Sequence, residues 1–107
     1  MGNQRINEGV HLHNLANVAT IYFAHPKQNC FPRAQIKALT KAIETCTKDD
    51  SVKVILLQSD PTNAFCAGAS FDELLAVQTP KQGKTFFMGF ANLINAMRLC
   101  SKPIVGR

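Results

Sequence analysis

The spacing of hydrophobic positions changes from one segment of the chain to the next. Apolar residues alternate with histidines over 10–13, and residues 18–23 are rich in β-branched and aromatic side chains, so both segments are predicted strands. A nearly continuous apolar run over 52–57 predicts a strand that is buried on both faces. Residues 102–106 begin one more predicted strand.

Helical spacing occurs in three further segments. In a predicted helix over 32–46, the apolar stripe consists of Ile36, Leu39 and Ile43. A short helix is expected over 71–77, with acidic residues in its first turn. Thr79 and Pro80 are start signals for a helix that runs to about Cys100. Its predicted stripe consists of Phe86, Phe90, Ile94 and Met97. This order of elements is typical of an α/β domain.

Composition and charge narrow the class of protein. The 107 residues suit one domain, and a hydrophobic fraction of 46% is enough for a core. The four cysteines are Cys30, Cys46, Cys66 and Cys100. They contain no CxxC pair, so free, buried or partly buried thiols are expected, with two disulfides as the alternative. Although the net charge is +5, the basic residues are scattered, which disfavours a nucleic-acid partner.

Location and metal binding can be judged from the same pattern. No apolar run approaches the roughly 20 residues that span a bilayer, and residues 1–7 lack the hydrophobic core of a signal peptide. We therefore expect a cytoplasmic location and no membrane partner. His11 and His13 share one face of a predicted strand and could share a metal, but without an evident third ligand we predict ordinary surface histidines and no metal site.

Three motifs resemble those of one enzyme superfamily. Residues 64–70 read AFCAGAS, follow a predicted strand and precede the short helix. They resemble the AF(C/A)AGAD segment of the crotonase, or enoyl-CoA hydratase/isomerase, superfamily. Residues 26–31, PKQNCF, resemble its RPxxxNAL turn, and residues 102–106, KPIVG, resemble its KPVIAA-type strand. The motifs occur in the family's order and cover nearly the whole chain.

The resemblance implies a fold and a chemistry. The fold would be α/β, a crotonase-like spiral of ββα units, of which residues 1–107 would form the incomplete N-terminal part of a single domain. Family members act on acyl-CoA thioesters through an enolate-like oxyanion, which backbone N–H groups near a helix N-terminus stabilise. By position, the N–H of Ala69 corresponds to the first oxyanion donor. The implied substrate-binding residues are Lys27, Gln28, Cys30, Ala67, Gly68, Ser70 and Phe71. The resemblance implies no cofactor apart from the coenzyme A of the substrate, and a homotrimer or hexamer for the full-length protein.

Two departures from the family pattern are visible. Ser70 stands where the family has aspartate, although serine can still cap the following helix. Cys30 and Phe31 replace a smaller alanine and leucine, which could reshape the acyl or pantetheine channel. In the family, the second oxyanion donor and the acid/base glutamates follow the strand that begins at Lys102. None of them is present here, so we expect the isolated chain to be inactive.

Several alternatives remain open at this stage. Lys27 could be an ordinary solvated lysine. Cys66 could act as a nucleophile near a helix N-terminus, although the resemblance gives it no such role. The three aromatic residues Phe86, Phe87 and Phe90 are expected in the core or in a subunit interface. The whole chain could instead be a small basic binding or assembly module that reuses the fold without catalysis.

Overall fold

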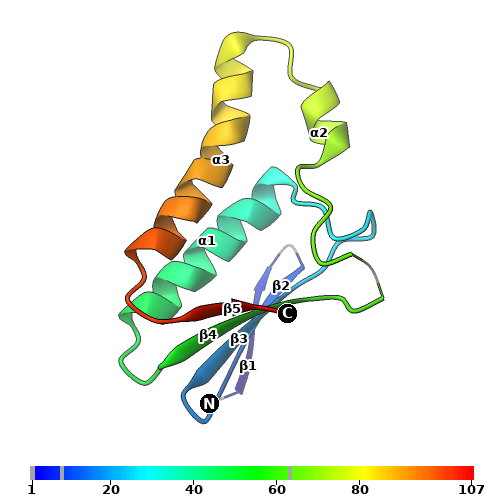
Figure 1. The fold of residues 1–107 in the computed structure, drawn as a ribbon. Coiled ribbons are helices and arrows are strands. Elements are labelled where there is room, and N and C mark those ends of the chain that lie inside the picture. The colour runs from blue at the N-terminus through cyan, green and yellow to red at the C-terminus, as the bar shows by residue number, and fades with distance from the viewer. Residues whose placement is uncertain (1, 8, 63) are drawn as a thin grey trace.

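A computed structural model describes residues 2–7, 9–62 and 64–107 (Figure 1). Its strands are β1 (Gly2–Asn7), β2 (Val10–Leu15), β3 (Val18–Phe23), β4 (Val54–Ser59) and β5 (Ile104–Gly106). Its helices are α1 (Arg33–Lys48), α2 (Phe71–Leu75) and α3 (Pro80–Leu99). All five strands belong to one sheet in the order β1-β2-β3-β4-β5. The predicted α/β class is confirmed.

The sheet is mixed, because its connections differ along the chain. Strands β1, β2 and β3 pair antiparallel, whereas β3, β4 and β5 pair parallel through helical crossovers. Ala16 and Asn17 form the two-residue turn between β2 and β3, with φ of 53° and 68°. Two successive positive φ values match the twist of a type I′ hairpin. The sequence predicts a turn over Leu15, Ala16 and Asn17, between the two strand patterns, and this prediction is confirmed.

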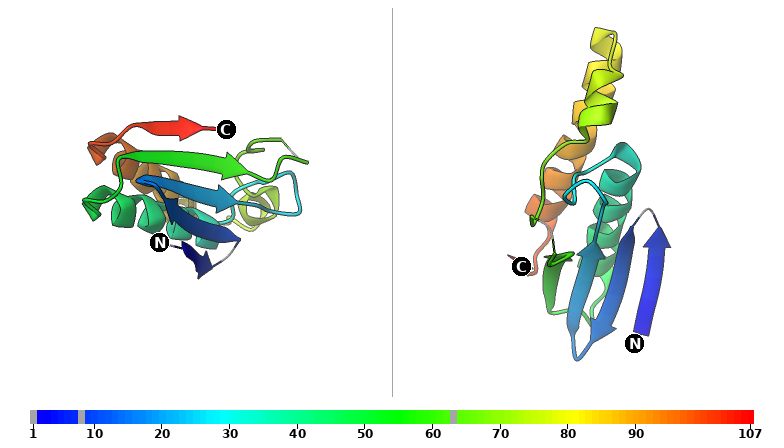
Figure 2. Two further views of the ribbon diagram at one scale, coloured as in Figure 1. Left: turned by 90° about the horizontal axis from the view of Figure 1, so that it is seen from below. Right: turned by 90° about the vertical axis from the view of Figure 1, so that its right-hand side faces the viewer.

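The core lies between one face of the sheet and the two long helices, which Figure 2 shows on the same side of the sheet. Alternate residues of β3 (Ala19, Ile21 and Phe23) point into this core and are buried. The stripe predicted for α1 is confirmed, since Ile36, Leu39 and Ile43 are all buried. Burying these side chains removes apolar surface from water, which stabilises the α1–sheet contact.

Three predictions need correction. The hydrophobic pattern predicts no helix or strand over the polar residues 2–7. This segment nevertheless pairs with β2 as an edge strand, because backbone hydrogen bonds need no apolar pattern. Strand β4 begins at Val54 and is fully buried on one face only, since the helices cover one side of the sheet. Ile94 of the predicted α3 stripe is 55% exposed, while Leu93 is buried in its place.

Helix α2 and the first turns of α3 project beyond the end of the sheet (Figures 1 and 2). Both helices begin at capping residues that the sequence predicted. The Ser70 hydroxyl accepts the Glu73 N–H at 3.4 Å, and the Thr79 hydroxyl accepts the Gln82 N–H at 3.1 Å, with Pro80 in the first helical turn. Helix α2 ends at Leu75, two residues earlier than predicted.

Candidate functional site

The turn that follows β3 is organised by a fully buried asparagine. Asn29 has no exposed surface and a φ of 57°. Its side-chain oxygen accepts the N–H of His25 at 2.9 Å. Its side-chain amide donates to the carbonyls of Asp60 at 3.2 Å and Ala64 at 2.9 Å. One side chain thus closes the turn and ties it to the loop that follows β4.

A parallel backbone bridge continues this connection. The Phe31 N–H donates to the Gly68 carbonyl at 2.7 Å, and the Ser70 N–H donates to the Phe31 carbonyl at 3.2 Å. Phe31 is therefore paired with Ala69, which lies between the two bonded groups. Gly68 has a φ of 92°, which glycine adopts without the penalty a side chain would bring. The motifs that the sequence singled out, separated by about forty residues, are adjacent in space.

The bridge determines where the Ala69 N–H points. In a parallel pair, the residue between the two bonded groups directs its own N–H and carbonyl to the opposite edge of the ribbon. Within the described part of the chain, no group accepts a hydrogen bond from the Ala69 N–H. Ala69 is partly buried, one residue before the N-cap of α2. This N–H is thus a fixed donor, close to the positive end of a short helix.

Helix α2 is attached to the preceding elements by both of its acidic side chains. The Lys27 ammonium donates to the Asp72 carboxylate, which links the turn to the first turn of α2. The Arg33 backbone N–H, at the start of α1, donates to the Glu73 carboxylate at 2.7 Å. The hydrogen bond to Asp72 raises the pKa of Lys27. Sequence reasoning assigned these carboxylates only to the helix dipole and missed both contacts.

The remaining predicted site residues differ in accessibility. Ala67 and Gln28 are exposed, and Phe71 is 67% exposed, so these three could meet a ligand. Gln28 also accepts the Ala64 N–H at 3.3 Å through its side-chain oxygen. Cys30 and Ser70 are buried, and their side chains support the loop from within.

The thiols of the site are held by local contacts. All four cysteines are free, as expected. Burial raises the pKa of the Cys30 thiol, whose sulfur lies 3.5 Å from Nδ1 of His25. The same nitrogen accepts the Lys27 N–H at 3.1 Å. The Cys66 sulfur accepts the Gly68 N–H at 3.3 Å. Both thiols therefore take part in shaping the loops.

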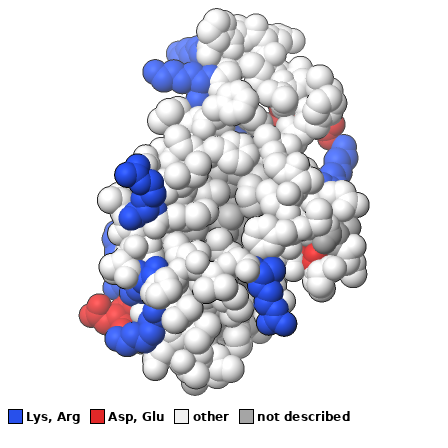
Figure 3. Space-filling view, in the orientation of Figure 1, with Lys and Arg blue, Asp and Glu red and all other residues white. Residues whose placement is uncertain are grey.

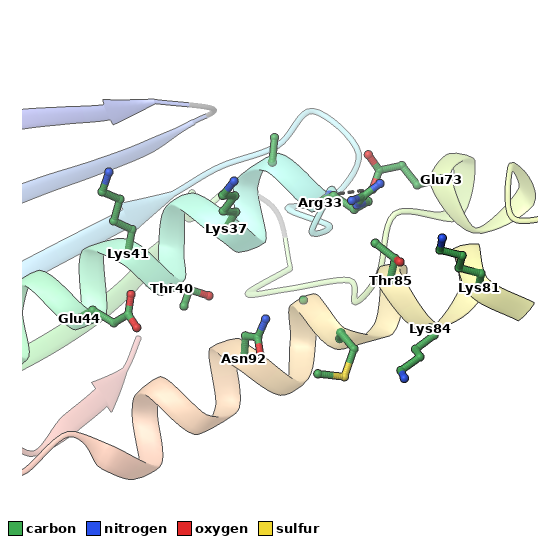
Figure 4. A pocket seen from close by; sticks show the side chains of 13 residues that line it. Arg33, Lys37, Thr40, Lys41, Glu44, Glu73, Lys81, Lys84, Thr85 and Asn92 are labelled. Atoms are coloured by element: carbon green, nitrogen blue, oxygen red, sulfur yellow. Dashed lines mark hydrogen bonds between the residues drawn. The ribbon is translucent and has the colours of Figure 1, made fainter.

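A cavity of about 1030 Å³ lies elsewhere, in an open groove between α1 and α3. Its charged lining residues are Arg33, Lys37, Lys41, Lys81, Lys84, Glu44 and Glu73. Figure 4 shows Thr40 and Glu44 on the side of α1 toward α3, whereas Lys37 and Lys41 point away from α3. The groove contains none of the residues predicted to bind a thioester. On the face drawn in Figure 3, basic side chains are scattered, as the sequence suggested.

The sheet face away from the helices carries the two histidines considered as metal ligands. His11 pairs with Tyr22 and His13 with Thr20, which places both histidines on one face. Across residues 2–7, 9–62 and 64–107, no three histidine, cysteine or acidic side chains gather as a metal site would require. None of the described helices is long and apolar enough to cross a membrane.

Comparison with known proteins now identifies the family. A family model described as enoyl-CoA hydratase/isomerase matches residues 13–107. The chain belongs to this family, which confirms the resemblance drawn from the three motifs. No curated protein matches the chain.

Solved structures of other proteins share the fold of this chain. An enoyl-CoA hydratase/carnithine racemase from Magnetospirillum magneticum is 22% identical with a TM-score of 0.86, over 97% of this chain and 39% of that one. An enoyl-CoA hydratase from Mycobacterium smegmatis is 22% identical with a TM-score of 0.85, over 94% and 39%. DspI from Pseudomonas aeruginosa is 19% identical with a TM-score of 0.84, over 94% and 41%. The chain spans about two fifths of these proteins.

Proposed function

We propose that this chain provides one half of an acyl-CoA thioester site, with the Ala69 N–H as a donor to the thioester oxygen. The observation that carries the proposal is the Ala69 N–H itself, which is fixed by the Phe31 bridge and has no acceptor in the described part of the chain. A preorganised donor of this kind stabilises the negative charge that an enolate places on oxygen. Family membership supplies the substrate class.

The surrounding residues support a ligand that passes along the junction of the two loops. Lys27, Gln28, Ala67 and Phe71 are exposed around Ala69, and Gly68 adds no side chain there. The small residues allow a thioester to approach the backbone, and Lys27 offers a positive charge to phosphate groups. Coenzyme A would be part of the substrate, with no separate cofactor.

The complete protein would be an enoyl-CoA hydratase or isomerase. Its second oxyanion donor and its acid/base carboxylates would come from outside the described residues. Removing one donor of an oxyanion hole lowers rates by roughly 10²–10³, so we expect no measurable turnover by this chain alone. The same proposal includes a homotrimer or hexamer for the full-length protein and a cytoplasmic location.

The test is an amide NMR titration of this chain with acetyl-CoA, at moderate salt. A matched ligand, S-ethyl-CoA, replaces the carbonyl with a methylene and keeps the rest of the molecule. We expect both ligands to shift the amides of residues 27–30 and 67–71. The Ala69 amide should shift downfield with acetyl-CoA only, because only acetyl-CoA offers it an acceptor.

Free adenosine diphosphate is the second control. It should leave the amides of residues 67–71 unchanged, since it has no thioester arm. Equal shifts of Ala69 with acetyl-CoA and S-ethyl-CoA would contradict the assignment of this N–H. Saturating acetyl-CoA without any localised shift would contradict binding by this chain.

The second candidate is a basic binding module without catalysis, favoured by the five cationic side chains that line the α1–α3 groove. Two carboxylates share that groove, and Lys37 and Lys41 point away from α3, so its charge is not focused on one point (Figure 4). This candidate would be favoured if the chain bound a duplex oligonucleotide with an affinity that fell steeply as the salt concentration rose. We expect only weak, nonspecific binding.

A further inference from the structure

One ion pair joins the two segments of the proposed thioester site. Lys27, in the turn after β3, and Asp72, in the first turn of α2, form a salt bridge. Their side chains are 65% and 66% exposed, so solvent and ligands reach both. Lys27 is one of the residues proposed to contact coenzyme A, whereas Asp72 brings a negative charge to the same place.

A phosphate group is a better partner for this lysine than Asp72 is. An exposed lysine–carboxylate pair contributes little to stability, because water competes with it and side-chain freedom is lost. A phosphate carries up to two negative charges and three acceptor oxygens, and it forms stronger hydrogen bonds with an ammonium. Asp72 would also repel a bound phosphate as long as it stays beside Lys27.

We propose that the Lys27–Asp72 pair is a latch, in which Asp72 holds the Lys27 ammonium in the free protein and a phosphate of coenzyme A replaces Asp72 on binding. The inference rests on the proposed function and adds Asp72 as a residue that sets affinity for phosphate-bearing ligands. Binding then exchanges one ion pair for another, and Asp72 turns toward solvent.

Opening the latch leaves the oxyanion loop in place. The Phe31–Ala69 bridge holds the loop from inside, and the Glu73 carboxylate keeps the start of α2 on the Arg33 N–H at 2.7 Å. Neither contact involves Lys27 or Asp72. The exchange therefore alters the charge beside the proposed site without moving the Ala69 donor.

The experiment compares coenzyme A with pantetheine, which lacks the phosphates, as ligands for variants of this chain. Dissociation constants come from amide titrations of the wild type, Asp72→Asn, Lys27→Gln and the double variant. We expect Asp72→Asn to bind coenzyme A about 2–5-fold more tightly, which is the strength of an exposed pair. In the Lys27→Gln background, the gain in coenzyme A affinity from Asp72→Asn should be clearly smaller than in the wild type, and pantetheine should bind all four proteins equally.

Glu44→Gln is the matched control, because it removes the same charge from an exposed carboxylate on α1 and should leave binding unchanged. Thermal unfolding verifies that each variant is folded. An equal gain from Asp72→Asn with and without Lys27 would overturn the latch, since it would reflect only general charge. Unchanged affinity of Asp72→Asn for coenzyme A would overturn the latch alone. No binding of coenzyme A by any variant would overturn the proposed function and the latch together.

Discussion

Replacing Asn29 with alanine is expected to be among the most damaging single changes in this chain. The asparagine side chain is fully buried and makes three hydrogen bonds, to the His25 N–H and to the carbonyls of Asp60 and Ala64. Asn29→Ala removes all three and leaves their partners without a bond. It also places an alanine at a φ of 57°, a conformation that asparagine tolerates better.

The magnitude follows from these two effects. Each lost buried hydrogen bond costs about 1 kcal/mol, and left-handed backbone at a residue with a β-carbon costs about 1–2 kcal/mol. The free energy of unfolding should therefore fall by about 4–5 kcal/mol, a large part of the roughly 5–15 kcal/mol that stabilises a domain. Asn29→Gly loses the same hydrogen bonds without the backbone strain, so it should be about 1 kcal/mol more stable than Asn29→Ala.

The assay is urea unfolding followed by circular dichroism, with amide spectra of the native state. Gln28→Ala is the control, because Gln28 is an exposed neighbour with a φ of 58° and one hydrogen bond of its side chain to the Ala64 N–H. It should cost less than about 1 kcal/mol. A loss below 1 kcal/mol for Asn29→Ala would refute the role given to the hydrogen bonds, and equal stability of the alanine and glycine variants would refute the strain contribution.

Three further changes have defined outcomes. Gly68→Ala adds a β-carbon that meets nothing within 4 Å, so only backbone strain remains, and urea unfolding should show a loss of about 1–2 kcal/mol. Lys102→Met removes the ammonium that donates to the Cys46 carbonyl at 2.6 Å near the end of α1, and the midpoint of thermal unfolding should fall. Hydrogen bonds from Thr62 lower the pKa of Asp60, so its contribution to stability is present above the unfolded pKa of about 3.9 and lost as the pH falls through the lowered folded value. Asp60→Asn should therefore flatten the acid end of the stability profile between about pH 5 and pH 2.

Much of the fold could be predicted from local pattern. The α1 stripe, the Ala16–Asn17 turn and the caps of α2 and α3 depend on neighbours within a few residues, and all were read correctly. Strand β1 could not be predicted in this way, because a polar edge strand is held by its backbone pairing with β2. The exposure of Ile94 also depends on how α3 sits against α1, which a helical stripe alone does not determine.

The sequence by itself determined the family, the order of the elements from β2 onward and the two segments that could form a site. Only the tertiary structure decided how those segments meet: Asn29 between the loops, Phe31 paired with Ala69, and Lys27 with Asp72. The physical reason is that a hydrogen bond or ion pair between residues about forty positions apart leaves no periodic signal in the sequence. Such contacts form where the ends of β3 and β4 bring the two loops together, and they set the direction of the Ala69 N–H.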